Sequence, residues 1–415
     1  MSKVSSSNGL EKYPKLRFPG FVEPWKVLEL SSILKERNEF AEKDGSFEHA
    51  TLSKDGIFGK TARYDRDFLV STENKKYKVT HINDLCYNPA NLKFGVICLN
   101  KYGDAIFSPI YVTFEIQSDY DADFVGENLS RWDFINKALR YQQGTVYERM
   151  AVSPEDFLTV KCYMPSKREQ EKLSKFIGLI DEKIVCQRKY IDVLKKYKRG
   201  LSDELFGENE TTEEWTTVPF GEAFDLLQNN TFSRDEMSSE SGIAYNIHYG
   251  DVLIKYGVVV DLSKSKVPYI RSDVSLSKYA QSSYLRDGDI VIADTAEDYT
   301  VGKAVEIVGV ADVKALSGLH TIPCRPKISF APMYLGYFIN SKRFRTQILP
   351  LVQGTKVSSI NKSEILKTSI AFPSFGVQSQ IATMLYALDH RIDICQACVQ
   401  GLARTKEALL QQLFI

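Results

Sequence analysis

The sequence predicts an α+β fold: two mixed α/β domains joined by two long helices that pack as an antiparallel coiled coil, with a pseudo-twofold internal repeat. Three observations support this prediction. The middle of the chain recurs near its end, both copies close with a long heptad pattern, and the segments between contain short apolar runs typical of strands.

The internal repeat is read from landmarks that recur in the same order. The first set is Gln143-Gly144-Thr145, Ser153, Val160, Pro165, Asp181, Ile184 and Leu205-Phe206. The second set is Gln353-Gly354-Thr355, Ser363, Ile370, Pro373, Asp389, Ile392 and Leu413-Phe414. The chain therefore contains two copies of one unit, each a globular segment followed by a long helix. Two similar units suggest a partner with two similar sites.

Both predicted helices carry apolar residues at alternating steps of four and three. The seam of the first contains Leu173, Ile177, Ile180, Ile184, Ile191, Leu194 and Leu201, with a last apolar residue at Leu205. The seam of the second contains Ile381, Leu385, Leu388, Ile392, Val399, Leu402 and Leu409, with a last apolar residue at Leu413. A period of 3.5 residues held over more than four heptads indicates a coiled-coil seam. Each helix requires a helical partner, and the other copy is the nearest candidate.

Polar residues interrupt both seams at matching places. Lys198 corresponds to Lys406, and Gln187 corresponds to Cys395. Such residues are either tolerated defects or a device that fixes the register of the pair, and the sequence alone leaves both interpretations open.

The helix ends also leave signals in the sequence. Ser166 stands three residues before Glu169 in capping-box spacing, whereas Ser374 has Val377 at that place. Gly207 ends the first helix.

Four segments follow from this pattern: a first domain with an N-terminal lead-in (1–164), a first helix (165–207), a second domain (208–372) and a second helix (373–415). Predicted strands are 78–82, 93–99, 110–116, 251–256, 289–293 and 304–308; predicted helices inside the domains are 129–139 and 334–347, and 206–214 is a linker. The two domain centres show no convincing identity. Repeating flanks around unlike centres predict a constant scaffold that displays two variable recognition modules.

Composition is that of an ordinary globular protein, with 415 residues, 43% of them hydrophobic and 26% charged. Residues 1–13 lack the apolar region of a signal peptide and no run of 18 apolar residues occurs, so we expect a cytoplasmic protein. Seven cysteines, an odd count, indicate reduced thiols. The spacing of Cys395 and Cys398 fits a zinc or redox site, but Cys395 occupies a seam position, and no metal site is expected.

The net charge is zero, with 53 basic and 53 acidic residues, so nucleic-acid binding has to come from local patches. Side chains able to contact bases or phosphates gather in both centres. In the first domain they are Asn88, Asn91, Lys93, Arg131, Arg140 and Gln143; in the second they are Tyr245, Asn246, His248, Tyr249, His320, Lys342, Arg343, Arg345 and Gln353. Each cluster alone is typical of surface decoration, and recurrence in the non-repeated centres favours a DNA-binding role.

Sequence motifs for catalysis are missing. There is no phosphate-binding glycine loop, no HExxH and no GxSxG, and Ser108-Pro-Ile-Tyr111 lacks the leading amide or carboxylate of an adenine methyltransferase motif. The chain is therefore expected to have no catalytic residues and to be non-catalytic.

Several segments together resemble the specificity subunits of type I restriction-modification enzymes. They are Pro14-Lys-Leu-Arg-Phe-Pro-Gly-Phe21 leading into Glu23-Pro-Trp25, the paired Gln-Gly-Thr segments, the pairs Pro165 with Gln170 and Pro373 with Gln378, and Gly288-Asp-Ile-Val-Ile-Ala-Asp294. The resemblance covers essentially the whole chain. The second copy departs from it because it lacks a counterpart of Phe18-Pro-Gly-Phe21.

The resemblance implies two target recognition domains, each reading one half of a split double-stranded DNA sequence, separated by two helices packed antiparallel. It implies two methyltransferase subunits as partners, which bind S-adenosylmethionine and methylate adenine N6, and restriction subunits that use ATP and Mg²⁺; this chain itself needs no cofactor. A helix of about 41 residues measures roughly 60 Å, the length of roughly 18 base pairs. Two other hypotheses remain open: a self-contained nuclease or methyltransferase with a diverged site, and a coiled-coil scaffold that binds no DNA.

Overall fold

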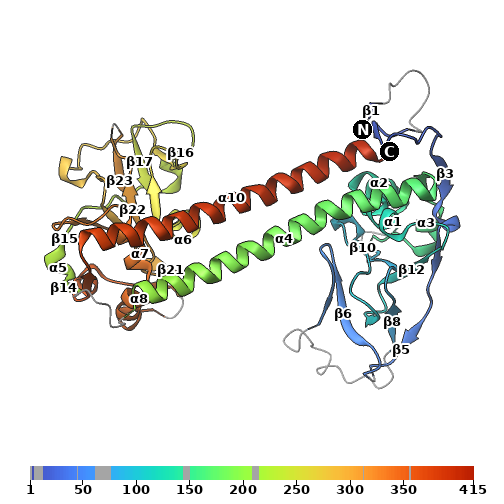
Figure 1. Ribbon diagram of the computed structural model, residues 1–415, viewed down its shortest axis with the longest axis horizontal. Coiled ribbons are helices and arrows are strands. Elements are labelled where there is room, and N and C mark those ends of the chain that lie inside the picture. Colours follow the sequence, from blue (N-terminus) through green and yellow to red (C-terminus); the bar gives the residue numbers. More distant parts are fainter. Residues whose placement is uncertain are drawn as a thin grey trace. The chain divides into compact units, whose positions relative to one another are not determined.

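A computed structural model describes residues 2–3, 13–43, 45–60, 76–143, 150–207, 215–311, 313–354 and 357–415 (Figure 1). The chain forms two compact units. Unit 1 contains residues 1–186 and 398–415, and unit 2 contains residues 187–397. Each unit is thus one globular domain together with part of both long helices, so its bounds differ from those of the four predicted segments.

The two long helices are present where the heptads predict them. Helix α4 is Lys167–Leu205 and α10 is Phe375–Leu413, 39 residues each, and Figure 1 draws them in green and red. Every predicted seam residue is buried or half-buried. The first seam positions of each helix, Leu173 and Ile177 in α4 and Ile381 and Leu385 in α10, lie in the cores of units 1 and 2 respectively. The start of each seam therefore packs on the domain that precedes it.

The two seam lysines form ion pairs across the helix pair. In unit 1 the Lys406 ammonium donates to Asp181 Oδ2 at 2.8 Å, and in unit 2 the Lys198 ammonium donates to Asp389 Oδ1. As α4 advances from Asp181 to Lys198, its partners on α10 run backwards, which is the predicted antiparallel pairing. Both pairs join repeat-equivalent positions, so the interpretation as a register lock is favoured over tolerated defects.

The domain of unit 1 contains two sheets. The first has the order β10-β9-β12-β4 and is antiparallel throughout. Its strands are β4 (Leu34–Glu36), β9 (Leu85–Tyr87), β10 (Ile97–Leu99) and β12 (Val112–Ile116). The second has the order β5-β8-β11-β6-β7, with strands β5 (Phe40–Ala41), β6 (Glu48–Ser53), β7 (Gly56–Gly59), β8 (Tyr77–Thr80) and β11 (Ala105–Phe107). Strands β1 (Ser2–Lys3) and β2 (Leu16–Arg17) form a separate pair.

The domain of unit 2 also contains two main sheets. One has the order β15-β24-β20-β22-β18, with strands β15 (Phe224–Leu226), β18 (Val259–Asp261), β20 (Ile290–Ala293), β22 (Ala304–Val308) and β24 (Thr321–Pro326). The other has the order β16-β19-β17-β23, with strands β16 (Met237–Ser238), β17 (Ala244–Ile247), β19 (Tyr269–Ile270) and β23 (Ala315–Ser317). Strands β21 (Thr295–Ala296) and β25 (Ser358–Ser359) pair separately.

The two centres repeat in topology although their sequences show no convincing identity. The order β4-β12-β9-β10 in unit 1 matches β15-β24-β20-β22 in unit 2, with antiparallel pairing at every step. Each domain is closed by a two-stranded pair, β3 (Lys26–Glu29) with β13 (Lys161–Met164) and β14 (Thr216–Pro219) with β26 (Ser369–Phe372). The internal repeat therefore extends through the modules.

Short helices complete both domains. Unit 1 has α1 (Ala122–Leu129), α2 (Trp132–Ala138) and α3 (Pro154–Thr159). Unit 2 has α5 (Phe220–Ala223), α6 (Tyr249–Ile254), α7 (Tyr334–Asn340), α8 (Lys342–Ile348) and α9 (Lys362–Ile365). The predicted helix 334–347 is thus two helices, and 129–139 is the end of α1 followed by α2.

Equivalent glutamines dock both long helices on their domains. The Gln170 amide donates to the Pro165 carbonyl and accepts from the Asp121 N–H, while Gln378 does the same with Pro373 and Ala331. Both glutamine side chains are buried, so each satisfies backbone groups that water does not reach. This explains the Pro-x(4)-Gln spacing in the repeat.

The far end of each long helix is anchored by a phenylalanine. Phe414 stacks on Phe124 of unit 1 at 5.1 Å between ring centroids and meets Trp25 edge-on. Phe206 meets both Tyr334 and Phe338 of unit 2 edge-on. Phe206 was predicted to begin a linker, but it is buried in the core, and residues 208–214 of that linker lie outside the described residues.

One predicted strand is wrong and another is shorter than expected. Residues 251–256 do not form a strand because α6 begins at Tyr249: the His248 ring accepts the Gly250 N–H, and Asp251 pairs with Lys255 one turn later. The first residues of the predicted strand 93–99 belong to a 3₁₀ turn over Leu92–Phe94 that ends at Gly95, whose φ of 77° requires glycine.

The N-terminal lead-in is fixed to α4 by a buried ion pair. The Arg17 guanidinium donates to both carboxylate oxygens of Glu169, each at 2.7 Å, and the two side chains are 5% and 2% exposed. Glu169 was expected to complete a capping box with Ser166, but its oxygens accept from Arg17 instead. The second copy has Val377 at this position, in agreement with the absence of a second lead-in.

Candidate nucleic-acid interface

The turn after β9 carries the first group of predicted DNA-contacting residues. Asn88 is a correction: it is buried, and its Oδ1 accepts the N–H groups of Ala90 and Asn91, so it holds the turn and is not free to read a base. Asn91 and Lys93 are exposed, and the Lys93 ammonium lies 5.2 Å from the ring centre of Phe94, itself 61% exposed. This turn presents an amide, a cation and a ring to solvent.

Of the predicted DNA-contacting residues around α2, one has a structural role and two are exposed. Arg131 is a second correction: its guanidinium lies over the Phe414 ring at 5.0 Å and pairs with Asp133, so it anchors the end of α10. Arg140 is exposed, and Gln143 is exposed with its amide donating to Asp156 Oδ2 at 2.9 Å. Gly144 and Thr145 lie outside the described residues.

In unit 2, Asn246 is a third correction. It is fully buried, its Oδ1 accepts from Asn230 and its amide nitrogen lies 3.2 Å from the Met237 sulfur, so it secures β17. Burial, followed by the charge of Arg234, lowers the pKa of His248 to about 4, so this ring is neutral near pH 7. It is 6% exposed and serves as the cap of α6.

An aromatic group surrounds the start of α6. Tyr249 meets the His320 ring edge-on at 5.2 Å and lies 4.6 Å from the ring of His248. His320 is exposed, has a φ of 54°, and its Nδ1 is 3.5 Å from both Asp294 Oδ1 and Thr295 Oγ1. A non-glycine residue in this backbone region marks a constrained turn. An exposed imidazole and a half-buried phenol ring thus lie next to each other, and such groups can stack on bases or donate to them.

The remaining aromatic candidate, Tyr245, is stacked on Tyr269 at 4.4 Å with their hydroxyls 2.9 Å apart. The hydrogen bond to Tyr269 raises the pKa of Tyr245, and burial adds to it. The Tyr245 phenol therefore stays protonated near neutral pH.

Helix α8 places three predicted cations near the C-terminal part of α4. Lys342 is exposed, and the Arg343 guanidinium lies 4.8 Å from the ring centre of Trp215. Arg345 is a fourth correction as a base reader, because its guanidinium donates to the carbonyls of Val301 and Tyr299. Gln353, past α8, is exposed and its backbone pairs with that of Ser359.

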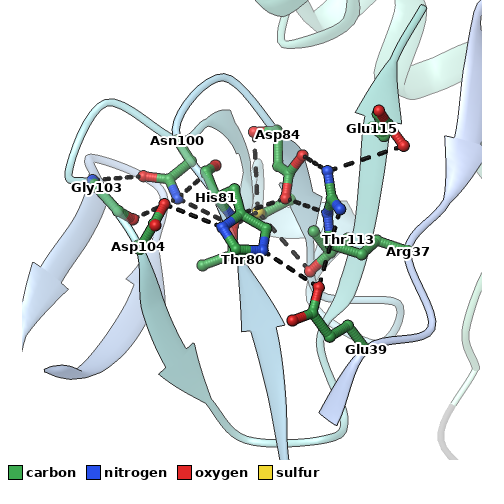
Figure 2. A network of polar contacts seen from close by, with 11 residues as sticks. Arg37, Glu39, Thr80, His81, Asp84, Asn100, Gly103, Asp104, Thr113 and Glu115 are labelled. Carbon is green, nitrogen blue, oxygen red and sulfur yellow. Dashed lines mark hydrogen bonds and ion pairs between the residues drawn. The ribbon is translucent and has the colours of Figure 1, made fainter. Parts of the chain in front are cut away.

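Sequence analysis missed a polar network between the two sheets of unit 1 (Figure 2). The Arg37 guanidinium donates to both oxygens of Asp84, at 2.8 and 3.0 Å, and Asp84 also accepts the His81 N–H. The buried Asn100 amide donates to Thr80 and to the His81 and Gly103 carbonyls. Arg37 and Asp84 are 47 residues apart in sequence, so their pairing leaves no local signal.

The histidine of this network is enclosed by acids. His81 contacts Asp104 Oδ1 at 3.0 Å through Nδ1 and Glu39 Oε2 at 3.2 Å through Nε2. Burial lowers the pKa of His81, but the hydrogen bonds to Asp104 and Glu39 outweigh it and the pKa is raised. Glu39, Asp104 and Glu115 are exposed acids, so this face disfavours the approach of phosphate.

Neither a metal centre nor a membrane span is found in the part of the chain that the structure describes. No group of three or more His, Cys, Asp or Glu side chains there could hold a metal ion. No helix there is long and apolar enough to cross a bilayer.

Comparison with known proteins finds similarity to type I restriction-modification proteins in both sequence and structure. No protein-family model matches the chain. Over 282 residues it is 23% identical to the type I restriction enzyme MjaVIII specificity subunit of Methanocaldococcus jannaschii, covering 63% of each chain. The aligned part therefore spans less than two thirds of that relative.

Two solved structures share the fold over nearly their whole length. The S subunit of a type I restriction-modification system from M. genitalium superposes with a TM-score of 0.55 at 14% identity, covering 97% of this chain and 99% of that one. A chain from a structural study of complex assembly and conformational transition of a type I system superposes with a TM-score of 0.56 at 14% identity, covering 96% and 99%. The resemblance noted in the sequence is thus confirmed, and this chain has the fold of these two proteins.

Proposed function

We propose that this chain is the DNA-specificity subunit of a type I restriction-modification complex. The observation that carries the proposal is the duplicated domain-plus-helix unit, locked by the equivalent pairs Lys406–Asp181 and Lys198–Asp389, in a chain similar in sequence and fold to such subunits. Two equivalent domains match a bipartite target in which each domain reads one half.

The side chains proposed to contact DNA are those that the structure leaves accessible. They are Asn91, Lys93, Arg140 and Gln143 in unit 1 and Tyr249, His320, Lys342, Arg343 and Gln353 in unit 2. Amides and cations of this kind read adenine and guanine edges and neutralise phosphates. The acidic face around His81 lies outside the proposed contact surface.

The helices are proposed to set the spacing between half-sites and to dock two methyltransferase subunits. Each helix of 39 residues measures roughly 60 Å at about 1.5 Å per residue. In this proposal the chain itself is non-catalytic. S-adenosylmethionine belongs to the methyltransferase subunits, which methylate adenine N6, and ATP and Mg²⁺ belong to the restriction subunits.

The test is to map methylated adenines in the genome of cells that express this chain with a methyltransferase partner. We expect one bipartite motif with an unread gap. Exchanging residues 215–353 for the same region of a related subunit should change one half of that motif and leave the other half and the gap intact.

Three results would contradict the proposal. Methylation or cleavage of DNA by the purified chain alone would make it an enzyme. A change in both half-sites after the exchange would refute modular reading. Failure of the full chain to bind DNA at low salt would favour a protein scaffold.

A further inference from the structure

A basic cavity lies beside the C-terminal part of α4 in unit 2. Its volume is about 700 Å³, and its charged lining residues are Lys195, Lys198, Arg199, Asp203, Lys342, Arg345 and Asp389. Five cations thus face two carboxylates. Of these, Lys198 is paired with Asp389, and Arg345 is held by two backbone carbonyls.

Three cations of the cavity remain available to a ligand. Lys195, Arg199 and Lys342 are exposed, and none forms an ion pair with another residue in the described ranges. Lys195 and Arg199 are four residues apart on α4, where side chains of one helix face are neighbours, about 5–6 Å apart at Cβ. Lys342 approaches from α8, so the charges converge from two elements.

The equivalent place in unit 1 has a different charge. A cavity of about 880 Å³ there is lined by Asp123, Glu127 and Asp181 together with Lys406 and Lys101, and by Lys54 and Asp55 from the β6–β7 turn. Lys406 is shared between Glu127 and Asp181, and Lys101 pairs with Asp123. An offset of 208 residues places Ala403 and Glu407 where unit 2 has Lys195 and Arg199. The basic cavity is therefore specific to unit 2 and does not follow from the repeated scaffold.

The cations continue beyond this cavity. A second hollow, of about 650 Å³, shares Ser202, Asp203 and Lys342 with the first and adds Arg343. A track of cations from Lys195 to Arg343 suits a polymer with regularly spaced negative charges, such as a nucleic-acid backbone, more than a single small anion.

We propose that this basic track in unit 2 binds the phosphate backbone of the target DNA, independently of base sequence, so that the two halves of the chain hold DNA with unequal strength. This inference rests on the proposed function, because it assumes that the chain binds double-stranded DNA. It adds contacts from α4 itself, outside the domain centres that carry sequence recognition. Phosphate contacts of this kind position a protein without specifying bases.

The experiment measures the affinity of the full chain for two 30-base-pair duplexes of unrelated sequence by fluorescence anisotropy over a series of salt concentrations. The variant is Lys195→Gln/Arg199→Gln/Lys342→Gln. If all three cations neutralise phosphates, the slope of log K against log salt should become shallower by up to about 2.7, at about 0.9 per phosphate. The slope should change by the same amount for both duplexes.

A control of matched charge is Lys175→Gln/Lys183→Gln/Lys189→Gln, which removes three exposed lysines of the same helix. It should leave the slope nearly unchanged. The proposal of a basic track would be overturned if the slope changed equally in both triple variants, or if it did not change in the first. Absence of DNA binding by the unaltered chain would instead overturn the proposed function. The proposal would also be overturned if the Lys195→Gln/Arg199→Gln/Lys342→Gln variant bound DNA normally but no longer co-purified with a methyltransferase subunit. The basic track would then bind an acidic protein surface instead of DNA.

Discussion

The buried ion pair between Arg17 and Glu169 fixes the N-terminal lead-in to α4, and a substitution at Glu169 tests this directly. Replacing Glu169 with valine removes both oxygens that accept from the guanidinium, and valine already occupies this position in the second copy, at Val377. The Arg17 charge, on a side chain 5% exposed, would then keep only neutral partners among the described residues, the Glu23 carbonyl and the Tyr13 ring. An uncompensated buried charge costs about 3–5 kcal/mol, so Glu169→Val should lower the free energy of unfolding by that amount.

The assay is urea unfolding of the full chain followed by circular dichroism, with thermal unfolding as a second measurement. For a unit of about 200 residues each kcal/mol shifts Tm by roughly 2–4 °C, so a fall of roughly 6–20 °C is expected for the transition of unit 1. Hydrogen exchange at the lead-in, residues 14–23, should rise in the same variant, because Arg17 ties this segment to α4.

Two further variants separate burial from charge. Arg17→Met combined with Glu169→Val replaces both partners with apolar groups and should recover most of the loss, because no charge is left unpaired. Asp273→Val breaks the exposed pair with Arg271 and should cost no more than about 1 kcal/mol. The reasoning is refuted if Glu169→Val costs as little as Asp273→Val, or if the double variant is no better than the single one.

The remaining predictions concern unit 2 and the helix seam. Lys198→Asp should cost about 1–2 kcal/mol through loss of the ion pair and of the contact with an aromatic ring, and adding Asp389→Lys should restore part of it in a double-mutant cycle. Burial raises the pKa of Glu306 from 4.5 to about 7, against the backbone N–H groups that favour its ionised form. Stability from this group is therefore full below about pH 4.5 and lost as the pH rises through 7, by up to about 3 kcal/mol, and Glu306→Gln should flatten the pH dependence of urea unfolding between pH 5 and 8. Leu194→Asp places an unpaired charge in the seam and should cost several kcal/mol, whereas Val193→Asp, at a side chain 60% exposed, should be nearly neutral; equal effects in thermal melts would disprove the seam assignment.

The scaffold could be predicted from sequence because its signals are local and periodic. The predicted bounds of both long helices lie within two residues of the observed ends, 165–207 against Lys167–Leu205 and 373–415 against Phe375–Leu413. Landmarks such as Gln170 and Gln378 recur because one side chain satisfies the same backbone groups twice. The common topology of the centres was not predictable, since strand order is carried by backbone pairing and the sequences that form it differ.

The candidate site was less predictable, because residue type does not reveal burial. Asn88, Asn246 and Arg131 have the chemistry of DNA-contacting side chains, yet each satisfies groups inside the protein. The pair of Arg37 and Asp84 was not predictable for a different reason, since 47 residues of sequence separate two side chains that only the fold brings together. Only the fold shows which polar residues have a structural role and which are accessible to a ligand.

The anchoring of Phe414 beside Trp25 also determines the order in which the chain can be completed during synthesis on the ribosome. Unit 2 is one continuous segment and can close as soon as it has emerged, whereas unit 1 needs residues 398–415, about two hundred residues after the rest of it. At about 5–20 residues per second this leaves roughly 10–40 s in which Trp25 and Phe124 have no Phe414 to cover them. A nascent chain therefore carries an open apolar surface on its first domain while unit 2 is being synthesised, and this is the stage at which chaperones or misassembly would act on it.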